Sequence, residues 1–574
     1  MRTTTTRNNI LINTRSNNRH SQFVRSARDT PSILYAQQLR LHSRRAIPLS
    51  VRPPRDMSAA RLLLELATSW WTIAALATFA AVAYRYATST FGYWRDRGVP
   101  HVRPIVPLFG NIAGMAMGWE HQSRMYGRMY DGFRGRRYGG LYQMRTPHLM
   151  VCDPALVNRV LIGDFAHFTD HGLYTAGPEE NPLANGLFNM TGAQWKIMRQ
   201  KLSPVFTAGK LRHMRGQVAA CSEQLMRNVA ADVPAAGGPV EVRDALGKYS
   251  TDVIGTCAFG LQLNAINDEQ SAFRKYGKTV FAPSFHMMFK ELVWMVSPAL
   301  RRALRIGDFP RDAVEFFTAA FTDTMRYRQE HGLVRDDVVQ SLIQARTDLV
   351  VNKTEPSVTF LETDIVANAF ILFAAGFETV STAMSFCLYE LALKKPIQDK
   401  VREEMNAMKI KHNTEVDDDF LKELHYLDMV LAETLRKYPP LITLFREATQ
   451  DYQVPDDTLI IEKGTKILIP AYAIHHDYRY YPDPETFDPE RFSPEEKAKR
   501  PNGTYMPFGD GPRLCIGKRF AEMEMKLALT ELLTKYEVEP CEKTDIPMRF
   551  SKRSLITVPE NGIWLKFKPI NTPK

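Results

Sequence analysis

The sequence predicts a mainly helical fold with small β-sheets, an α+β class, for most of its 574 residues. Beyond about residue 120, apolar residues recur at helical spacing, and strand-like runs are short and bounded by Gly, Pro and Asp. No internal repeat of about 20–50 residues is visible, which argues against a solenoid fold. The six cysteines are scattered without a CxxC pair, so neither a disulfide scaffold nor a zinc ribbon is expected.

Residues 1–56 form a basic leader. They hold eleven arginines, two aspartates and no lysine or glutamate, a net +9 of the +11 carried by the whole chain. This composition is typical of a mitochondrial transit peptide, and also of upstream sequence read through from a start before the true one, which would then be Met57. The remaining residues are close to neutral, so binding of nucleic acid by the folded part is disfavoured.

Residues 57–90 are expected to form a membrane anchor. The stretch from Leu66 to Tyr84 contains nineteen residues without a charge. At ~1.5 Å per residue such a helix nearly spans a ~30 Å hydrocarbon layer. Arginines follow it directly, so the positive-inside rule places the rest of the chain in the cytosol if Met57 is the start. The arginines of the leader oppose this orientation if Met1 is the start. A buried core helix is the alternative interpretation.

Residues 91–110 are predicted to be a stiff proline-rich hinge, because proline fixes the backbone and cannot continue a helix. Residues 111–574 are expected to form one compact body. Its predicted helices include 193–203, 210–232, 311–331, 361–395, 397–410 and 419–438, and its strand-like runs span 141–151, 457–469 and 553–567. Residues 470–515 are predicted to be a long ordered loop, and such loops are usually functional.

The strongest chemical signal is the segment Phe508-Gly509-Asp510-Gly511-Pro512-Arg513-Leu514-Cys515-Ile516-Gly517. Cys515 precedes a helical pattern, and a helix N-terminus with free backbone N–H groups favours thiolate over thiol. Gly511 and Gly517 let the backbone pass close to a flat group without a Cβ clash. Phe508 can shield the sulfur from water, and Arg513 can pair with a carboxylate. These are the needs of a thiolate ligand to haem iron, with Arg513 on a propionate.

FxxGxRxCxG is the haem-binding signature of cytochrome P450 monooxygenases, and residues 508–517 match it at every fixed position. The sequence therefore resembles this family, over roughly residues 90 to 570. Smaller stretches at 191–195, 202–207 and 251–255 look like microsomal insect detoxification enzymes, whose clan also holds vertebrate drug-oxidising forms. The resemblance implies a cytochrome P450 fold for the catalytic domain at 111–574, haem b as the cofactor, and Cys515 as the axial ligand of the haem iron.

Glu433-Thr434-Leu435-Arg436 is an ExxR motif whose two charges lie on one helix face. Taken alone, such a pair is usually a solvated salt bridge. In the family it joins an arginine from a PERF-type segment, which is Pro489-Glu490-Arg491-Phe492 here. The resemblance implies that Glu433, Arg436 and Arg491 form a buried charge triad with a structural rather than a catalytic role.

The segment 375–379 breaks the pattern of a long apolar helix. A glycine within a helix costs about 1 kcal/mol relative to alanine, and a buried glutamate is also unfavourable, so we interpret the departure as a functional groove. In the family an acid–alcohol pair at this place carries protons to the dioxygen that is reduced. The resemblance implies that Glu378 relays protons from solvent and that Thr379 is the hydrogen-bonding alcohol. The family often has Thr or Ser next, where this chain has Val380.

Trp195 and Arg199 form a WxxxR motif, and their i, i+4 spacing places both side chains on one helix face. Each can donate a hydrogen bond to a carboxylate, although the usual reading of such a pair is an aromatic anchor beside an exposed arginine. Within the resemblance both are expected to contact a haem propionate. Arg446, which follows a Tyr-Pro-Pro segment, is a further candidate for the same role.

The resemblance implies a haem-thiolate monooxygenase that inserts one oxygen atom of O2 into lipophilic substrates. These are xenobiotics such as insecticides or plant toxins, or endogenous hormones, steroids or fatty acids. No dinucleotide fingerprint is present, so NADPH should bind a partner, NADPH-cytochrome P450 reductase, with cytochrome b5 as a second donor. Basic residues beside the motifs are candidates for a docking face: Lys196, Lys201, Lys437, Lys518 and Arg519.

The expected location is the endoplasmic reticulum membrane, with the catalytic domain facing the cytosol. A mitochondrial hydroxylase fed by a ferredoxin is the main alternative, because of the basic leader. A haem-thiolate isomerase or dehydratase should lack the acid–alcohol pair. Candidate substrate-lining segments are 167–190, 281–295, 367–379, 441–445 and 555–556. The second is rich in Phe and Met, which suits a site that adapts to several ligands, and equally a membrane-contacting surface or plain core.

Overall fold

The computed structural model describes residues 69–173, 181–234, 237–281, 309–554 and 556–570, together with Glu65, Val293, Ala303, Leu304 and Gly307. The chain divides into two units, Met1–Tyr86 and Ala87–Lys574. The basic leader at 1–56 and the candidate start at Met57 lie outside the described residues. So do most of the Phe- and Met-rich segment 281–295, residues 174–180 and Leu555.

Helix α2 (Trp70–Thr88) carries the apolar pattern that predicts an anchor. Its large side chains are exposed along its length, and Trp71 is 85% exposed. Such a helix gains little from core packing and needs another apolar environment. Among the described residues, the one helix that is long and apolar enough to cross a membrane is Glu362–Leu393, and that helix is mostly buried inside the protein. The anchor at 57–90 therefore stays a prediction.

The described residues of the second unit form three small sheets. The largest has the strand order β1-β2-β7-β4 and joins an antiparallel hairpin to a parallel and then an antiparallel neighbour. A three-stranded sheet has the order β3-β9-β8, and β5 pairs with β6. The strands are β1 (Tyr138–Gln143), β2 (Thr146–Val151), β3 (Gly238–Glu241), β4 (Leu444–Glu447), β5 (Tyr452–Gln453), β6 (Ile460–Ile461), β7 (Lys466–Ile469), β8 (Tyr536–Pro540) and β9 (Trp564–Pro569).

Helices make up most of the second unit. They are α3 (Tyr93–Asp96), α4 (Ala113–Ala116), α5 (Gln122–Gly132), α6 (Pro154–Asn158), α7 (Gly192–Leu202), α8 (Ala208–Asp232), α9 (Val242–Phe259), α10 (Ala272–Phe281), α13 (Arg311–Glu330), α14 (Val338–Ala345), α15 (Glu362–Leu393), α16 (Lys395–Lys411), α17 (Asp418–Glu423), α18 (His425–Lys437), α19 (Ala471–His475), α20 (Pro494–Lys499) and α21 (Lys518–Leu533). The predicted α+β class is confirmed.

The predicted helices differ from the observed ones in places. The single helix expected at 419–438 is two helices, α17 and α18, because Leu424 between them leaves the helical region with ψ of 68°. The strand-like run at 553–567 becomes a strand only from Trp564 onward. The expected loop at 470–515 is ordered but contains α19, α20 and two short 3-10 helices, Pro489–Phe492 and Gly511–Arg513.

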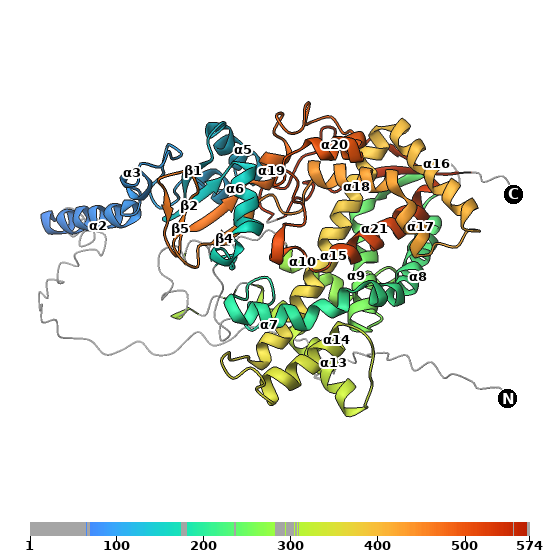
Figure 1. Cartoon of the computed structure of the whole chain (residues 1–574). Coiled ribbons are helices and arrows are strands. Elements are labelled where there is room, and N and C mark those ends of the chain that lie inside the picture. The colour runs from blue at the N-terminus through green and yellow to red at the C-terminus, as the bar shows by residue number, and fades with distance from the viewer. Residues whose placement is uncertain are drawn as a thin grey trace, which may run out of the picture. The chain divides into compact units, whose positions relative to one another are not determined.

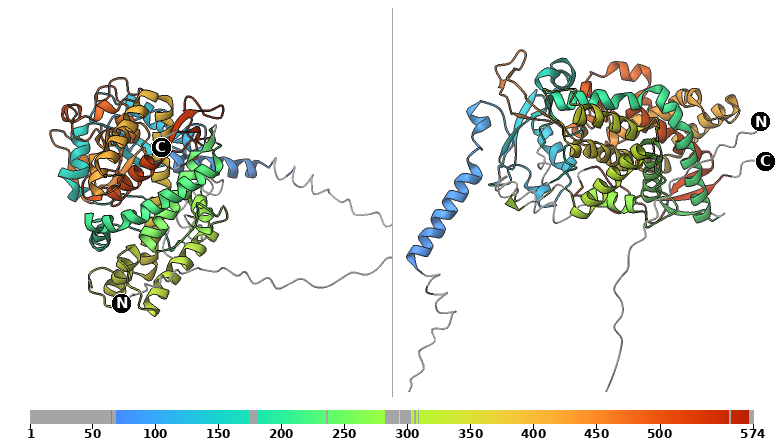
Figure 2. Two further views of the ribbon diagram at one scale, coloured as in Figure 1. Left: turned by 90° about the vertical axis from the view of Figure 1, so that its right-hand side faces the viewer. Right: turned by 90° about the horizontal axis from the view of Figure 1, so that it is seen from below.

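Helix α15 is the central element of the second unit. It is 32 residues long, and it packs against α9, α13, α14, α18 and α21. Figure 1 shows the four-stranded sheet at one end of this unit and the helices α8, α16 and α17 toward the other, with α15 between them, and Figure 2 gives two further views. A mostly apolar helix that is packed on several sides has few solvated faces, which explains why its sequence is hydrophobic nearly all round.

The proline-rich segment 91–110 packs as part of the second unit. Trp94 is buried, and its ring lies so close to Gly140 on β1 that an added Cβ would overlap it. The N–H of Val102 donates to the carbonyl of Gly140 (2.9 Å). The segment is therefore fastened to the four-stranded sheet, not separate from it.

Candidate active site

The loop before Cys515 is fixed by its own backbone. The N–H of Cys515 donates to the carbonyl of Phe508 (2.9 Å), and the Asp510 side chain accepts from the N–H of Gly511 (2.8 Å). Gly511 has a φ of 69°, and a Cβ there would overlap the carbonyl oxygen of Leu161. Only glycine fits this position. The predicted need for glycine is therefore met, but through close packing on Leu161.

The surroundings of the Cys515 thiol have opposing effects on its pKa. Burial is the largest effect and raises its pKa, while the N–H of Gly517 and the charge of Arg199 lower it. The helix N-terminus effect predicted from the sequence is present but outweighed, so the free thiol stays protonated near neutral pH. A metal ion binds only the thiolate and would reverse this balance. The Cys515 side chain is nevertheless accessible, so a metal ion could reach the sulfur.

Three residues predicted to bind one group meet beside this loop. Arg513 is buried, and its guanidinium lies 4.1 Å from the centre of the Trp195 ring. Arg199 lies on the same helix, α7, and its Nη2 donates to the carbonyl of Leu514 (2.8 Å). The WxxxR motif and Arg513 therefore come together, and α7 is fastened directly to the cysteine loop.

Arg513 also ties the cysteine loop to helix α15. Its Nη2 donates to the carbonyl of Met190 (2.7 Å) and its Nη1 to the carbonyl of Leu187 (3.3 Å). The N–H of Leu187 in turn donates to Asn368 on α15 (3.0 Å). A continuous hydrogen-bonded path thus connects the loop that holds Cys515 with the helix that holds the predicted acid–alcohol pair.

Arg446 on β4 is a buried cation without an acidic partner among the described residues. Its Nη1 donates to a neighbouring carbonyl, and its buried Nε has no hydrogen-bond partner there. Burial lowers its pKa to about 10. Burial also lowers the pKa of Arg513 to about 9; Asp170 opposes this, and Arg446 and Arg199 add to it. Buried cations are costly unless paired, so this group of guanidiniums is suited to pairing with an anion.

Helix α15 exposes one stripe in an otherwise buried surface. Ile371, Ala375 and Thr379 are accessible, whereas most residues around them are buried. Residues four apart lie on one helix face, so these three residues form one accessible stripe along α15. The Oγ1 of Thr379 donates to the carbonyl of Ala375 (2.8 Å), a common local bond for a helical threonine.

Glu378 is buried and forms an ion pair with Arg243 on α9. Gly376 has a different role from the one its position predicted. A Cβ at Gly376 would lie 2.7 Å from Ile254 on α9, so this glycine lets α9 pack closely on α15. The helix interruption interpreted as a groove is thus explained by helix packing at Gly376, and the accessible face lies at Ala375 and Thr379.

The residues of the predicted charge triad lie together. Arg436 donates to Glu433 from Nε (2.7 Å) and Nη2 (2.8 Å), and both side chains are fully buried. The N–H of Asp488 donates to Glu433 (3.0 Å), and the Nε of Arg491 lies 3.6 Å from the same carboxylate. Burial acts to lower the pKa of Arg436, but the bonds to Glu433 raise it. Arg436 also donates to the carbonyl of His475 (3.0 Å), so the pair joins α18 to the segment before the cysteine loop.

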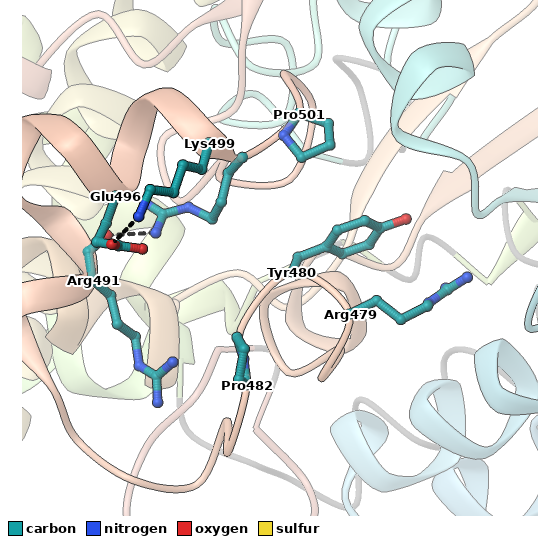
Figure 3. A pocket seen from close by; sticks show the side chains of 8 residues that line it. Arg479, Tyr480, Pro482, Arg491, Glu496, Lys499 and Pro501 are labelled. Carbon is teal, nitrogen blue, oxygen red and sulfur yellow. Dashed lines mark hydrogen bonds and ion pairs between the residues drawn. The ribbon is translucent and has the colours of Figure 1, made fainter.

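A separate pocket of about 210 Å³ lies next to Arg491, as Figure 3 shows. It is lined by Arg479, Tyr480, Pro482, Arg491, Glu496, Lys499, Arg500 and Pro501. Arg479 pairs with Asp477 (2.5 Å) and Lys499 pairs with Glu496 (2.5 Å). The pocket contains one member of the triad and no residue of the cysteine loop, so it is distinct from the site around Cys515.

Sequence reasoning missed several residues of the site. Asp170 lies 3.5 Å from Arg513, and His171 bonds to the carbonyl of Phe188 (2.7 Å). Burial lowers the pKa of His171 to about 3, helped by the charges of Arg446 and Arg513. No motif spacing marks these two residues. The surrounding sequence mixes polar and apolar residues, so hydropathy does not mark them either.

The haem that the resemblance implies fits the residues present. It needs a thiolate, and Cys515 offers an accessible sulfur. It is flat, and an added Cβ at Gly517 would meet no atom within 4 Å, so the loop leaves room there. It carries propionates, and the unpartnered Nε of Arg446 is a buried donor suited to a carboxylate.

Comparison with known proteins agrees with this geometry. The family model for cytochrome P450 matches residues 100–567. Probable cytochrome P450 6a14 of Drosophila melanogaster is 38% identical over 511 residues, 87% of this chain and 100% of that protein. Cytochrome P450 6a2 of the same fly is 37% identical over 86% of this chain and 98% of its own length. Cytochrome P450 6k1 of Blattella germanica is 36% identical over 86% and 96%. The chain therefore belongs to the cytochrome P450 family of haem-thiolate monooxygenases.

Proposed function

We propose that the protein oxidises lipophilic xenobiotics, such as insecticides or plant toxins, or endogenous hormones, steroids or fatty acids, with electrons from NADPH. The reaction joins substrate R–H, O2, two electrons and two protons, and it yields R–OH and water. The observation that carries the proposal is the pairing of an accessible cysteine with an accessible helix stripe that ends at Thr379. Cys515 would supply a thiolate once it binds iron, and Thr379 supplies an alcohol.

In this proposal each predicted residue has one task. When bound, haem b supplies the iron at which O2 is reduced. Cys515 would hold that iron through its sulfur, and a thiolate ligand pushes electron density onto iron. Trp195, Arg199, Arg446 and Arg513 hold the propionates, while Phe508, Gly511 and Gly517 shape the loop around the sulfur. The triad of Glu433, Arg436 and Arg491 keeps the loop in place.

Proton supply is assigned to helix α15. Thr379 presents its hydroxyl on the accessible stripe, and Glu378 is the neighbouring acid. A side chain that moves a proton must reach it directly or through one water. Glu378 is buried and paired, so we propose that it exchanges protons through water and passes them toward the Thr379 hydroxyl.

The electron donor is proposed to be NADPH-cytochrome P450 reductase, with cytochrome b5 as a second donor. Of the five basic residues expected at a docking face, Lys196 and Arg519 are exposed. Lys201, Lys437 and Lys518 lie near acidic partners at 2.6, 2.8 and 3.9 Å. Steering by a basic face is sensitive to salt. The catalytic domain is proposed to face the cytosol from the endoplasmic reticulum membrane, anchored by residues 57–90.

The test is product mass from the full chain in membranes with reductase, NADPH, isotopically labelled O2 and a panel of lipophilic compounds. A reduced carbonyl spectrum first confirms thiolate-bound haem. We expect one labelled oxygen atom in the product, with a requirement for NADPH and a loss of product in Thr379→Ala. Turnover with a ferredoxin system alone would instead favour a mitochondrial hydroxylase, and conversion without any electron donor would favour an isomerase or dehydratase.

A further inference from the structure

We propose that Arg243 is a positioning residue for the Glu378 carboxylate, and that water bound at Arg243 and Arg274 carries protons to this carboxylate from the surface. The inference rests on the proposed role of Glu378 and extends it. It concerns where the protons enter the protein and which side chains hold the path open.

A row of charged side chains leads from the surface to Glu378. The exposed fraction of the side chain falls along it, from 53% at Lys278 to 34% at Asp244, 31% at Arg243, 8% at Arg274 and 4% at Glu378. These side chains come from three helices, α9, α10 and α15. Ion pairs join Asp244 to Lys278 and Arg274, a separate ion pair joins Arg243 to Glu378, and Arg274 acts on Glu378 through its charge. The row therefore forms a polar seam through an otherwise apolar helix interface.

The seam contains buried N–H groups that no described protein atom satisfies. These are the Nε of Arg243 and the Nε and Nη1 of Arg274. Buried donors in folded proteins are almost always bonded, by ordered water where no protein group is near. Arg274 is pressed against α9 so closely that a Cβ at Gly247 would overlap its guanidinium. Its free N–H groups therefore have a fixed direction in which to hold water.

Two arginines from neighbouring helices act on the Glu378 carboxylate. Arg243 pairs with Glu378 from α9, and Arg274 acts on it from α10. Burial lowers the pKa of Arg274, while Glu378 and Asp244 raise it. Burial raises the pKa of Asp244, but its hydrogen bond to Lys278 and the charges of Arg274 and Lys248 outweigh this effect and lower the pKa to about 2.

Arginine does not release its proton at neutral pH. The guanidiniums therefore cannot hand on protons themselves, and they act by orienting water and the carboxylate. Each turnover takes two protons from solvent, and each proton passes through water to a Glu378 oxygen and on toward the Thr379 hydroxyl. Without Arg243 the carboxylate loses its fixed direction and the water loses one of its anchoring donors.

The test compares Arg243→Gln and Arg243→Lys with Glu378→Gln, all in the full haem-loaded chain. Arg311→Gln is the matched control, because Arg311 also pairs with a glutamate (2.9 Å) but is 92% exposed on α13. We expect Arg243→Gln to lower turnover about tenfold, a part of the usual effect of proton transfer, with little change in the substrate KM. The solvent deuterium isotope effect should rise, and Arg243→Lys should recover most of the rate.

An infrared measurement gives a readout that does not depend on turnover. The carboxylate band of Glu378 is assigned in the resting protein by subtracting the spectrum of Glu378→Gln. We expect that band to shift in Arg243→Gln and to stay unchanged in Arg311→Gln. If Glu378→Gln slows turnover while Arg243→Gln matches the parent in rate, isotope effect and band position, the inference fails and the proposed role of Glu378 stands. If Glu378→Gln itself matches the parent, both fail.

Discussion

Replacing Glu433 by glutamine tests the buried pair most directly. The carboxylate accepts two bonds from Arg436 and one from the N–H of Asp488, and both side chains are 0% exposed. Removing one partner of such a pair leaves an uncompensated buried charge and costs about 3–5 kcal/mol. A glutamine keeps one acceptor oxygen, so we expect a loss of about 3 kcal/mol, near the lower end of that range. This raises the unfolded fraction about a hundredfold.

The measurement is the urea midpoint for loss of thiolate-bound haem, followed by the reduced carbonyl spectrum of the full chain. The double variant Glu433→Leu/Arg436→Met removes both charges, and we expect it to recover at least half of the loss, because apolar replacement of a whole buried pair is often close to neutral. Asp419→Asn serves as the control, since Asp419 pairs with Lys422 at the same i, i+3 spacing on an exposed helix face. A parental midpoint for Glu433→Gln would refute the reasoning.

Further predictions concern the cysteine loop, the anion site and pH. Gly511→Ala should yield protein without a thiolate-haem spectrum, because its Cβ overlaps the Leu161 carbonyl; a normal spectrum would contradict this. Arg446→Leu should make the haem-free chain more stable to urea, because it removes an unpaired buried cation. The haem-loaded variant should lose haem about tenfold faster, which corresponds to about 1.4 kcal/mol. Haem release at the parental rate would exclude a propionate contact. His121 and His148 are buried, and burial lowers both pKa values to about 4. The unfolded chain therefore binds more protons between about pH 6.5 and 4, so stability is complete above this window and falls as pH drops through it. Each histidine should contribute a slope of about 1.4 kcal/mol per pH unit, and urea midpoints of His148→Gln should show a flatter slope.

The helices that were predicted well share one property. In α13 and α16 one face is apolar and the other charged, so the period of the pattern is visible in the sequence. Helix α9 was not predicted, because its sequence mixes Val, Ile and Thr with glycines, which lowers helix propensity. Thirteen of its 18 residues are buried, and the helix packs against α8 and α15. Tertiary packing therefore determines that this segment is helical, and no local sequence pattern indicates the helix.

In the candidate site too, residues that local helix spacing brings together can be predicted from the sequence, and residues that tertiary contacts bring together cannot. Trp195 and Arg199 lie together because helix geometry fixes their distance, and Glu433 and Arg436 do so for the same reason. Asp170, His171 and Arg243 reach the site only through folding of distant segments, so nothing in their sequence neighbourhood marks them. The charge of the Cys515 sulfur also depended on the fold, because the burial that outweighs the helix N-terminus cannot be judged from the loop sequence.

These contacts imply that folding and haem binding are coupled in this chain. Arg446 and Arg513 are buried with lowered pKa values, and the thiol of Cys515 has a raised one. Each shift records a charged form that its protein surroundings disfavour, and each is relieved by a group that brings carboxylates to the guanidiniums and a metal ion to the sulfur. A group that binds the native chain and not the unfolded one stabilises the native chain. The haem-free protein should therefore open first at β4 and at the cysteine loop, where the uncompensated charges lie, while the Glu433–Arg436 pair, which is complete without haem, should hold α18 and its neighbours until global unfolding.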